Sequence, residues 1–417
     1  MMKIIKLLIY TMILVGIFTL PAFAQEGEIT ISVDGLGVYL DTPPLVENGR
    51  TLVPFRAIAE ALNVSVTWDD KSRTISAMDS GVGVILQIGS NTAYINNAPI
   101  DLDASPQLIG GRTLIPLRFF SEAYHCQVVW DSAKAEVKIV SPPRAMDVWG
   151  FYALGDSSTS SWEDLFGQPY PQRDTGNTDL VSHLALGWYS LDRNGTLLTK
   201  SRTGWQRPEG WEDVLEAAKQ SEMFTEMVVH VTDSDKTISD LLTNETAMLN
   251  AVQLISEEAE KYQGVNLDFE GLGYQDEGQE LQEVQDRFTA FVKLLSLQLK
   301  TAGRSLTLTL HAPNSAYKGY NYKALGELAD QIIIMAYDYG SKPEPVSLVK
   351  QAVEMAESLV PPQKLYLGIS APSESGESII TKIGIAKHYG LGGIALWRLG
   401  LITDEMWQSL RISIQPR

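Results

Sequence analysis

Apolar residues in the second half of the chain gather in short runs, and stretches with helical spacing separate these runs. We predict eight strands from them, at 148–153, 180–188, 227–231, 264–269, 305–310, 331–336, 364–369 and 392–397. Apolar runs that alternate with helices are typical of parallel strands covered on both faces. Residues 147–417 also approach the roughly 250 residues of a closed eight-stranded barrel. The pattern therefore predicts an α/β fold, a (β/α)8 TIM barrel, over 147–417.

The earlier part of the chain, residues 28–140, contains an internal repeat. The run Gly-Arg-Thr-Leu-Val-Pro at 49–54 recurs as Gly-Arg-Thr-Leu-Ile-Pro at 111–116, and each copy continues to a Trp-Asp pair. We predict in each copy a turn, an amphipathic helix (54–62; 116–124), a strand ending in Trp-Asp, a polar turn and a further strand (73–77; 135–140). The repeat predicts a small α+β domain of two similar units. A Pro-rich linker at 141–146 follows it.

The first 24 residues differ from the rest of the chain. Lys3 and Lys6 precede an apolar run at 7–20, and the small-x-small sequence Ala-Phe-Ala ends at Ala24. This is the pattern of a secretory signal peptide, and the run is too short for a stable membrane span. We expect cleavage after Ala24 and a secreted, soluble protein, extracellular or at the cell wall. An uncleaved N-terminal anchor is the alternative.

Charge and cysteine content narrow the classes of partner. The formal net charge is −18, so the protein repels polyanions over long range and nucleic acid is not an expected partner. Cys126 is the single cysteine, so no internal disulfide can form. We interpret it as a small buried apolar residue.

The fourth predicted strand carries the candidate chemistry. With a period of two, Val265, Leu267 and Phe269 share one face, and the opposite face holds a carboxamide and two carboxylates: Asn266, Asp268 and Glu270. Carboxylates two positions apart lie only ~7 Å apart along the strand and shift each other's proton affinity. The arrangement suits acid/base chemistry, although a strand end whose acids cap a helix or face water is the alternative.

Other predicted strands also end in polar or aromatic residues. They are Tyr152, Trp188, His230, His311, Tyr337 and Trp397. In barrel enzymes the carboxyl ends of the strands carry the active site, so this clustering favours catalysis. The histidines show no metal-ligand spacing, and we expect neither a metal nor a cofactor. His230 and the other barrel histidines are interpreted as structural or as lying at the edge of a cleft.

The repeat region resembles the exported module known as the copper amine oxidase N-terminal-like, or stalk, domain. The resemblance rests on the Gly-Arg-Thr-Leu-Val-Pro run and the Trp-Asp pair in both copies. Despite that family's name, the region holds one histidine, His125, and a copper site would need several. Arg56 and Arg118 are expected to pair internally rather than to bind an anion. The resemblance suggests a spacer or docking element, with possible association with the cell wall.

Residues 147–417 resemble glycoside hydrolase family 18. The resemblance rests on three ordered motifs: Asn-Leu-Asp-Phe-Glu at 266–270, Met-Ala-Tyr-Asp at 335–338 and the last apolar run ending at Trp397. It implies a retaining mechanism in which the substrate's own N-acetyl group attacks the anomeric carbon. It also implies catalytic roles for Glu270 (acid and base), Asp268 and Tyr337, and substrate contacts from Asn266, Met335, Asp338, Trp397 and Tyr152. We expect the neighbouring carboxylate and partial burial to raise the pKa of Glu270.

Two departures from that family bear on the substrate. Gln263 and Asn266 stand where chitinases have the first two acids of the motif, and Asn266 cannot share a proton as an acid would. The connection at 370–391 is too short for the insertion that walls many chitinase clefts, so we expect a shallower cleft. The pattern looks more like the branch of spore-cortex and cell-wall N-acetylglucosaminidases of the YaaH and SleL type. We therefore favour peptidoglycan as the glycan partner, with a chitinase or endoglycosidase, or a non-hydrolytic glycan-binding protein, as alternatives.

Overall fold

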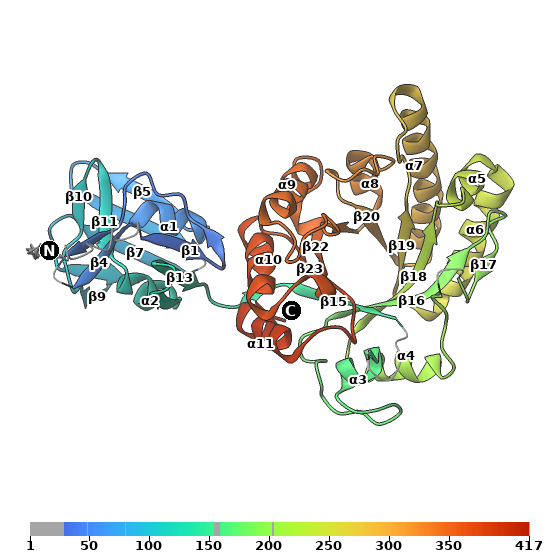
Figure 1. The fold of residues 1–417 in the computed structure, drawn as a ribbon, viewed down its shortest axis with the longest axis horizontal. Helices are drawn as coiled ribbons and strands as arrows, with labels where there is room; N and C mark the ends of the chain where they lie inside the picture. The colour runs from blue at the N-terminus through green and yellow to red at the C-terminus, as the bar shows by residue number, and fades with distance from the viewer. Residues whose placement is uncertain (1–28, 48, 80, 154–158, 202–203, 417) are drawn as a thin grey trace, which may run out of the picture.

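The computed structural model describes residues 29–47, 49–79, 81–153, 159–201 and 204–416, which form two domains side by side (Figure 1). The predicted signal peptide lies outside the described residues. Within the described ranges, no helix is both long enough and apolar enough to span a bilayer.

The N-terminal domain is rich in strands and holds two short helices among its described residues. Its strands are β1 (Thr30–Val33), β2 (Leu36–Gly37), β3 (Leu45–Glu47), β4 (Arg50–Pro54), β5 (Ser65–Asp69), β6 (Thr74–Asp79), β7 (Val82–Gln87), β8 (Thr92–Ile95), β9 (Ala98–Asp101), β10 (Gln107–Ile109), β11 (Arg112–Pro116), β12 (Gln127–Asp131) and β13 (Glu136–Val140). The helices are α1 (Phe55–Ala61) and α2 (Arg118–Tyr124). Both predicted helices and both Trp-Asp strands are present.

The two repeats interlock rather than fold separately. Strand β4 of the first copy pairs antiparallel with β11 of the second, and β1 pairs parallel with β13. The Gly-Arg-Thr-Leu runs, predicted as turns, are these central strands, because their apolar residues are buried between the copies. Phe55 stacks on Phe120 across the repeat at 5.7 Å. Arg118 pairs with Asp103 at 3.2 Å, a loop partner that the helix pattern did not predict.

The C-terminal domain is the predicted barrel, and the fold prediction is confirmed. Among the described residues, eight parallel strands close on themselves through the pairing of β15 with β16. In spatial order they are β15 (Asp147–Tyr152), β23 (Gly393–Trp397), β22 (Leu365–Ser370), β21 (Gln331–Met335), β20 (Ser305–His311), β19 (Gly264–Glu270), β18 (Phe224–Thr232) and β16 (His183–Leu191). Each predicted strand matches one of these.

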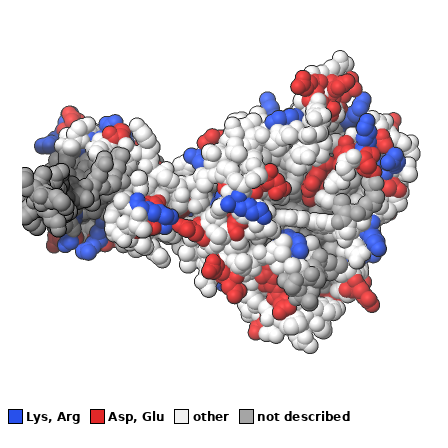
Figure 2. Space-filling view, in the orientation of Figure 1, with Lys and Arg blue, Asp and Glu red and all other residues white. Residues whose placement is uncertain are grey.

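Helices surround the barrel. They are α3 (Ser161–Phe166), α4 (Trp211–Gln220), α5 (Thr237–Thr243), α6 (Glu245–Glu258), α7 (Gly278–Thr301), α8 (Tyr322–Leu328), α9 (Val346–Glu357), α10 (Gly376–His388) and α11 (Asp404–Ser413), with short 3-10 turns at Ala259–Lys261, Pro362–Lys364 and Ala371–Ser373. Two-residue strands β14 (Arg144–Ala145), β17 (Leu197–Leu198) and β24 (Ile414–Gln415) lie outside the barrel. The long helix α7 projects from the rim, and acidic side chains gather at its free end (Figures 1 and 2).

The barrel domain contains two separate hydrophobic clusters. The larger one lies between the strands and the helices, and the smaller one fills part of the interior. The interior cluster consists of Trp149, Phe151, Ala185, Val228, Ile333, Tyr366 and Ala395, with Trp397 packed against it. On the side of the interior formed by β18, β19 and β20, polar residues take the place of apolar ones. This polar side of the interior holds the candidate site.

The two domains meet at helix α10. Lys138 of the N-terminal domain lies 3.2 Å from Glu377, and Asp34 lies 3.6 Å from Lys387. The Arg144 side chain donates a hydrogen bond of 2.6 Å to the Lys387 carbonyl. Only α10 lies between β22 and β23 apart from a 3-10 turn, as the short connection predicted. The N-terminal domain is therefore held against the helix that leads into β23.

Candidate active site

Strand β19 places its acids as the period of two predicts. Asn266 and Asp268 face the interior and are buried, and Glu270 at the strand's end has 32% of its side chain exposed. The alternate residues pack outward against the helices. In the register of the sheet, Asp268 lies between His230 of β18 and Thr309 of β20. The two carboxylates thus lie at the carboxyl end of the barrel, one below the mouth and one in it.

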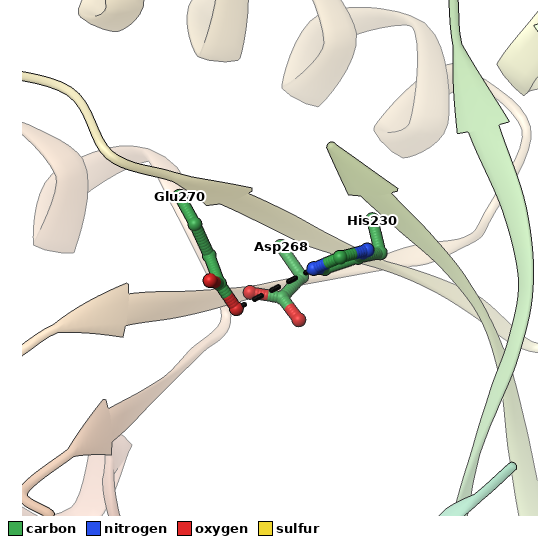
Figure 3. A group of neighbouring side chains, drawn as sticks. All are labelled: His230, Asp268 and Glu270. Atoms are coloured by element: carbon green, nitrogen blue, oxygen red, sulfur yellow. Dashed lines mark ion pairs between the residues drawn. The ribbon is translucent and has the colours of Figure 1, made fainter. Parts of the chain in front are cut away.

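Glu270 makes its charged contact with a histidine from the next strand. Nε2 of His230 lies 3.5 Å from Oε1 of Glu270 (Figure 3). Burial raises the pKa of Glu270, but the contact with His230 and the charges of His230 and His311 outweigh burial, so this pKa lies below its ordinary value. The expectation of a raised Glu270 pKa was wrong, because it took account of the neighbouring acid and not of the histidine.

The raised pKa belongs to Asp268 instead. Burial, followed by the charge of Glu270, raises the pKa of Asp268 to about 8. Among the described residues its Oδ1 atom has no hydrogen-bond partner. Burial and the charge of Glu270 thus favour the protonated form of Asp268, whereas the contact with His230 favours the ionised form of Glu270.

A buried polar column lies beneath Asp268. Oδ1 of Asn266 accepts a hydrogen bond of 2.8 Å from the Thr309 hydroxyl. Below it, Glu226 of β18 is fully buried and accepts hydrogen bonds from Thr307 at 2.8 Å and Ser305 at 3.1 Å. Burial raises the pKa of Glu226 well above its ordinary value. An acid whose protonated form is favoured by burial thus lies behind the site, on the third strand instead of the fourth.

The residues of the Met-Ala-Tyr-Asp motif lie on the far side of the mouth. Burial, with the charges of Asp268 and Glu270, raises the pKa of Tyr337 well above its ordinary value, so Tyr337 lies within range of both charges. Met335 is buried beneath it. Asp338 has an exposed side chain and a left-handed backbone (φ 64°), and its N–H donates a 3.0 Å hydrogen bond to Glu344. Asp338 therefore lies at the rim rather than in the floor.

An aromatic wall closes the other side of the site. Trp397 packs edge-on against Phe151 at 5.4 Å and stacks on Trp205 at 4.9 Å. Trp205 in turn stacks on His230 at 5.0 Å, so three rings form a continuous stack. Position 187 must lack a side chain, because a Cβ there would collide with the Trp205 ring.

Tyr152 is not brought to the site. It is buried in the cluster between strands and helices, where it packs edge-on against Trp188 at 6.1 Å. Its neighbour Phe151 faces the interior instead. The prediction placed Tyr152 by its position at the strand's end, whereas the period of two assigns the inward face of β15 to Trp149 and Phe151.

Sequence reasoning missed Glu226 and the role of His230 as a partner of Glu270, and it placed Trp205 only among several aromatic residues that could stack on glycan rings. The signal for the first two was a polar residue at every fourth position of an apolar strand, since Glu226, Val228 and His230 share one face of β18. The predicted strand began at Met227 and so excluded Glu226. Trp205 lies in a loop, where no periodicity marks a direction.

A cavity of about 600 Å³ borders the site on the His230 side. It is lined by residues that follow β16 and β18, and His230 lines it whereas Asp268 and Glu270 do not. Ligand atoms of His230, Asp268 and Glu270 all lie within 4.8 Å of one another, which is compact enough to hold a metal ion. We interpret the three side chains as an acid–base group and assign none of them as a metal ligand.

Comparison with known proteins agrees with this geometry. Residues 149–376 match the model of glycosyl hydrolases family 18, and residues 32–139 match the copper amine oxidase N-terminal domain. The chain is 30% identical over 148 residues to the putative sporulation-specific glycosylase YdhD of Bacillus subtilis, covering 33% of this chain and 33% of that protein. It is 22% identical to the cortical fragment-lytic enzyme of Bacillus anthracis, covering 55% and 67% of the two chains.

Solved structures show the same fold. The spore cortex-lytic enzyme SleL of Bacillus cereus aligns with a TM-score of 0.53 at 18% identity, over 67% of this chain and 76% of that one. A chitinase from Chromobacterium violaceum aligns with a TM-score of 0.53 at 18% identity, over 64% and 98%. Since the first family model covers more than half of the chain, the protein belongs to glycosyl hydrolases family 18 and carries a copper amine oxidase N-terminal domain ahead of its barrel.

Proposed function

We propose that the protein hydrolyses β-linked N-acetylglucosamine glycans with retention of configuration, and that peptidoglycan is its substrate. The observation that carries this proposal is the pair of carboxyl groups, Asp268 and Glu270, which lie two positions apart on β19 at the carboxyl end of the barrel, with the pKa of Asp268 raised and that of Glu270 lowered. Acid/base cleavage of a glycosidic bond needs a carboxyl group that can both give and take a proton at the reacting atoms.

The first half of the reaction uses the proton that Asp268 holds. When the acetamido group of the substrate binds, Asp268 passes its proton to Glu270 and accepts a hydrogen bond from the acetamido N–H. Glu270 gives that proton to the leaving oxygen as the C1–O bond breaks. The acetamido oxygen bonds to C1, and the Asp268 carboxylate offsets the positive charge of the oxazolinium ion.

The second half reverses the proton's path. Glu270, now ionised, takes a proton from a water molecule as the water oxygen attacks C1 and the bond from the acetamido oxygen to C1 breaks. Two displacements at C1 retain its configuration. The Tyr337 hydroxyl, whose pKa responds to the charges of both acids, hydrogen-bonds the acetamido oxygen while it reacts. Trp397 supplies a flat apolar surface to the C–H groups of the sugar ring.

The proposed site differs from that of chitinases in its acids, which supports a different glycan. The relatives named as cortical fragment-lytic enzymes support peptidoglycan. The short connection between β22 and β23 leaves the cleft without an added wall on that side. We propose that residues 1–24 direct export, so that the protein acts outside the cell or at the cell wall, and that the N-terminal domain contributes to association with the wall.

The test is to incubate the purified full-length chain with peptidoglycan and, separately, with chitin oligosaccharides, and to identify the products by mass spectrometry. We expect fragments of peptidoglycan with reducing-end N-acetylglucosamine. The Glu270→Gln variant is the matched control, because it keeps the shape of the site but cannot deliver a proton. Cleavage of chitin alone would replace the substrate by chitin, and cleavage of neither glycan would overturn the proposed activity.

A further inference from the structure

We propose that His230 is a positioning residue of the catalytic acid: it holds the Glu270 carboxylate in place and sets the pH range in which the Asp268–Glu270 pair keeps its proton. This inference rests on the proposed function for its consequence in catalysis. The contact itself can be tested without any substrate.

The first argument is the geometry of the contact. His230 lies opposite Asp268 in the register of the sheet, and its Nε2 reaches past that residue to Oε1 of Glu270, 3.5 Å away. The histidine side chain is 7% exposed, so water screens the contact little. Figure 3 shows the imidazole and both carboxylates turned toward one another. One imidazole therefore neighbours both acids.

The second argument is how the ring is held. Trp205 stacks on one face of the imidazole at 5.0 Å, with the two ring planes 20° apart. Trp205 is itself backed by Trp397, so the same stack ties His230 to the proposed sugar-binding wall. The ring also borders the 600 Å³ cavity, and its Nδ1 atom is buried with no hydrogen-bond partner among the described residues. A histidine needed only as packing would not require its Nε2 to face the catalytic carboxylate.

The third argument is what this chain lacks. Asn266 stands directly behind Asp268, and an amide cannot take up or release a proton at neutral pH. A second group that titrates near neutral pH beside Asp268 therefore has to come from another strand. Imidazole is the side chain that titrates in this range. His230 is that group in the described part of the barrel mouth, since His311 stacks on Tyr317 at 4.1 Å and makes no hydrogen bond to either acid.

The charged groups around the contact favour a protonated His230 and an ionised Glu270. Glu270 and Asp268 face His230 from β19, and together they outweigh burial and raise the pKa of His230 above its ordinary value. Across the cavity lie Asp192, Arg193 and Asp235. Glu270 faces His311, Tyr337 and Asp338 on its other sides. A protonated imidazole between the acids favours the charged form of Glu270 and leaves the shared proton on Asp268.

The first experiment measures the imidazole directly. The pKa of His230 is read from nitrogen-detected NMR titration of the full-length chain, with the His230→Gln spectrum used to assign its signal among the five histidines. In the Glu270→Gln variant we expect this pKa to fall by about one unit, because an opposite charge nearby favours protonation. The signal of His388, far from the site, is the internal reference. An unchanged His230 pKa would overturn the inference.

The second experiment measures catalysis against pH. The His230→Gln variant keeps a hydrogen-bond donor but loses the charge, so we expect the basic limb of its kcat/KM profile to move up by about one unit, since the acid pair holds its proton more tightly. KM should stay near the wild-type value while kcat falls. His311→Gln is the matched control: burial lowers the pKa of His311, and its ring stacks on Tyr317, so we expect its basic limb to move less than that of His230→Gln.

The outcomes separate the two proposals. A lower kcat in His230→Gln with an unmoved basic limb would mean a purely structural role for His230 and would reject the inference alone. Activity retained in Glu270→Gln would reject the proposed catalytic acid instead. A fall in the His230 pKa on Glu270→Gln substitution supports the contact even if neither glycan is cleaved.

Discussion

The two domains use the same side chain, aspartate, in opposite ways. In the N-terminal domain, Asp69 and Asp131 end the Trp-Asp strands, and each accepts hydrogen bonds from two backbone N–H groups of the turn that follows. Those hydrogen bonds lower the pKa of Asp69 below its ordinary value. In the barrel, Asp268 is buried, its Oδ1 makes no hydrogen bond among the described residues, and burial raises its pKa to about 8.

The difference teaches how to tell a structural acid from a reactive one. An acid that stabilises a turn is ionised and accepts hydrogen bonds from the backbone, so it carries no proton to transfer. An acid prepared for chemistry is desolvated and only partly satisfied, so its proton can move when a substrate arrives. Both acids follow an apolar strand pattern, and sequence spacing alone does not separate them.

The largest effect should come from the reactive side of this comparison. Glu270→Gln removes the group that gives and takes the proton, and general acid–base catalysis contributes roughly 10²–10⁴-fold to rate. We expect kcat on peptidoglycan to fall by that factor while binding of the glycan, measured by pull-down of the insoluble polymer, is retained. Equal turnover by the variant and the wild type would contradict the assignment.

An intermediate effect is expected from Glu226, a buried acid without a proposed catalytic contact. Glu226→Ala leaves the hydroxyls of Thr307 and Ser305 without their acceptor and opens a cavity, which should lower the free energy of unfolding by about 2–4 kcal/mol. Glu226→Gln keeps the shape of the protonated acid and should cost far less. Urea unfolding of the two variants, followed by circular dichroism, measures both values.

The pH dependence of these unfolding curves tests the protonation state of Glu226. Because the folded-state pKa of Glu226 is raised, its contribution is complete below the ordinary pKa near 4.5 and declines as the pH rises toward the folded-state value. Glu226→Gln cannot ionise and should therefore gain stability relative to wild type between pH 5 and pH 8. A constant difference across that range would mean that Glu226 is ionised in the folded protein.

The smallest effect belongs to the structural acids. Asp131→Ala removes the acceptor for the N–H groups of Ala133 and Lys134, and Asp69→Ala does the same in the first repeat. We expect each to lower the melting temperature by less than Glu226→Ala does, and to leave kcat unchanged. Differential scanning calorimetry and the peptidoglycan assay provide the measurements. A loss of activity in either variant would show that the N-terminal domain takes part in catalysis.

Much of the fold could be predicted because the outward face of each barrel strand, and much of the inward face, is apolar. Each run is bounded by polar stretches, so its position follows from hydrophobicity alone. The N-terminal domain was harder. Its repeat located α1 and α2, but strands β7 to β9 lie between the copies, where no repeat marks them. The central strands β4 and β11 were predicted as turns, because a glycine and an arginine stand at the start of each run. The buried apolar residues come only after them.

Some features of the candidate site could also be predicted from the sequence, and others could not. Asp268 and Glu270 could be placed on one face from a single strand, because alternation depends only on local geometry. Which of the two acids has the higher pKa could not be predicted, since this depends on His230 from a neighbouring strand. Tyr152 was misplaced by one residue, and one residue is enough to reverse a strand's face. Contacts between strands are set by register, which the sequence does not display.

Gly187 gives the site an unusual sensitivity to a single methyl group. Its missing side chain is what admits the Trp205 ring between His230 and Trp397. In a Gly187→Ala variant the new methyl group would collide with the Trp205 ring, and the Trp205 side chain would have to move away. One face of the His230 ring and one face of the Trp397 ring would then be exposed together. The side of the site that holds the positioning residue His230 and the side proposed to hold the sugar are thus connected through one glycine, and neither can be remodelled without the other.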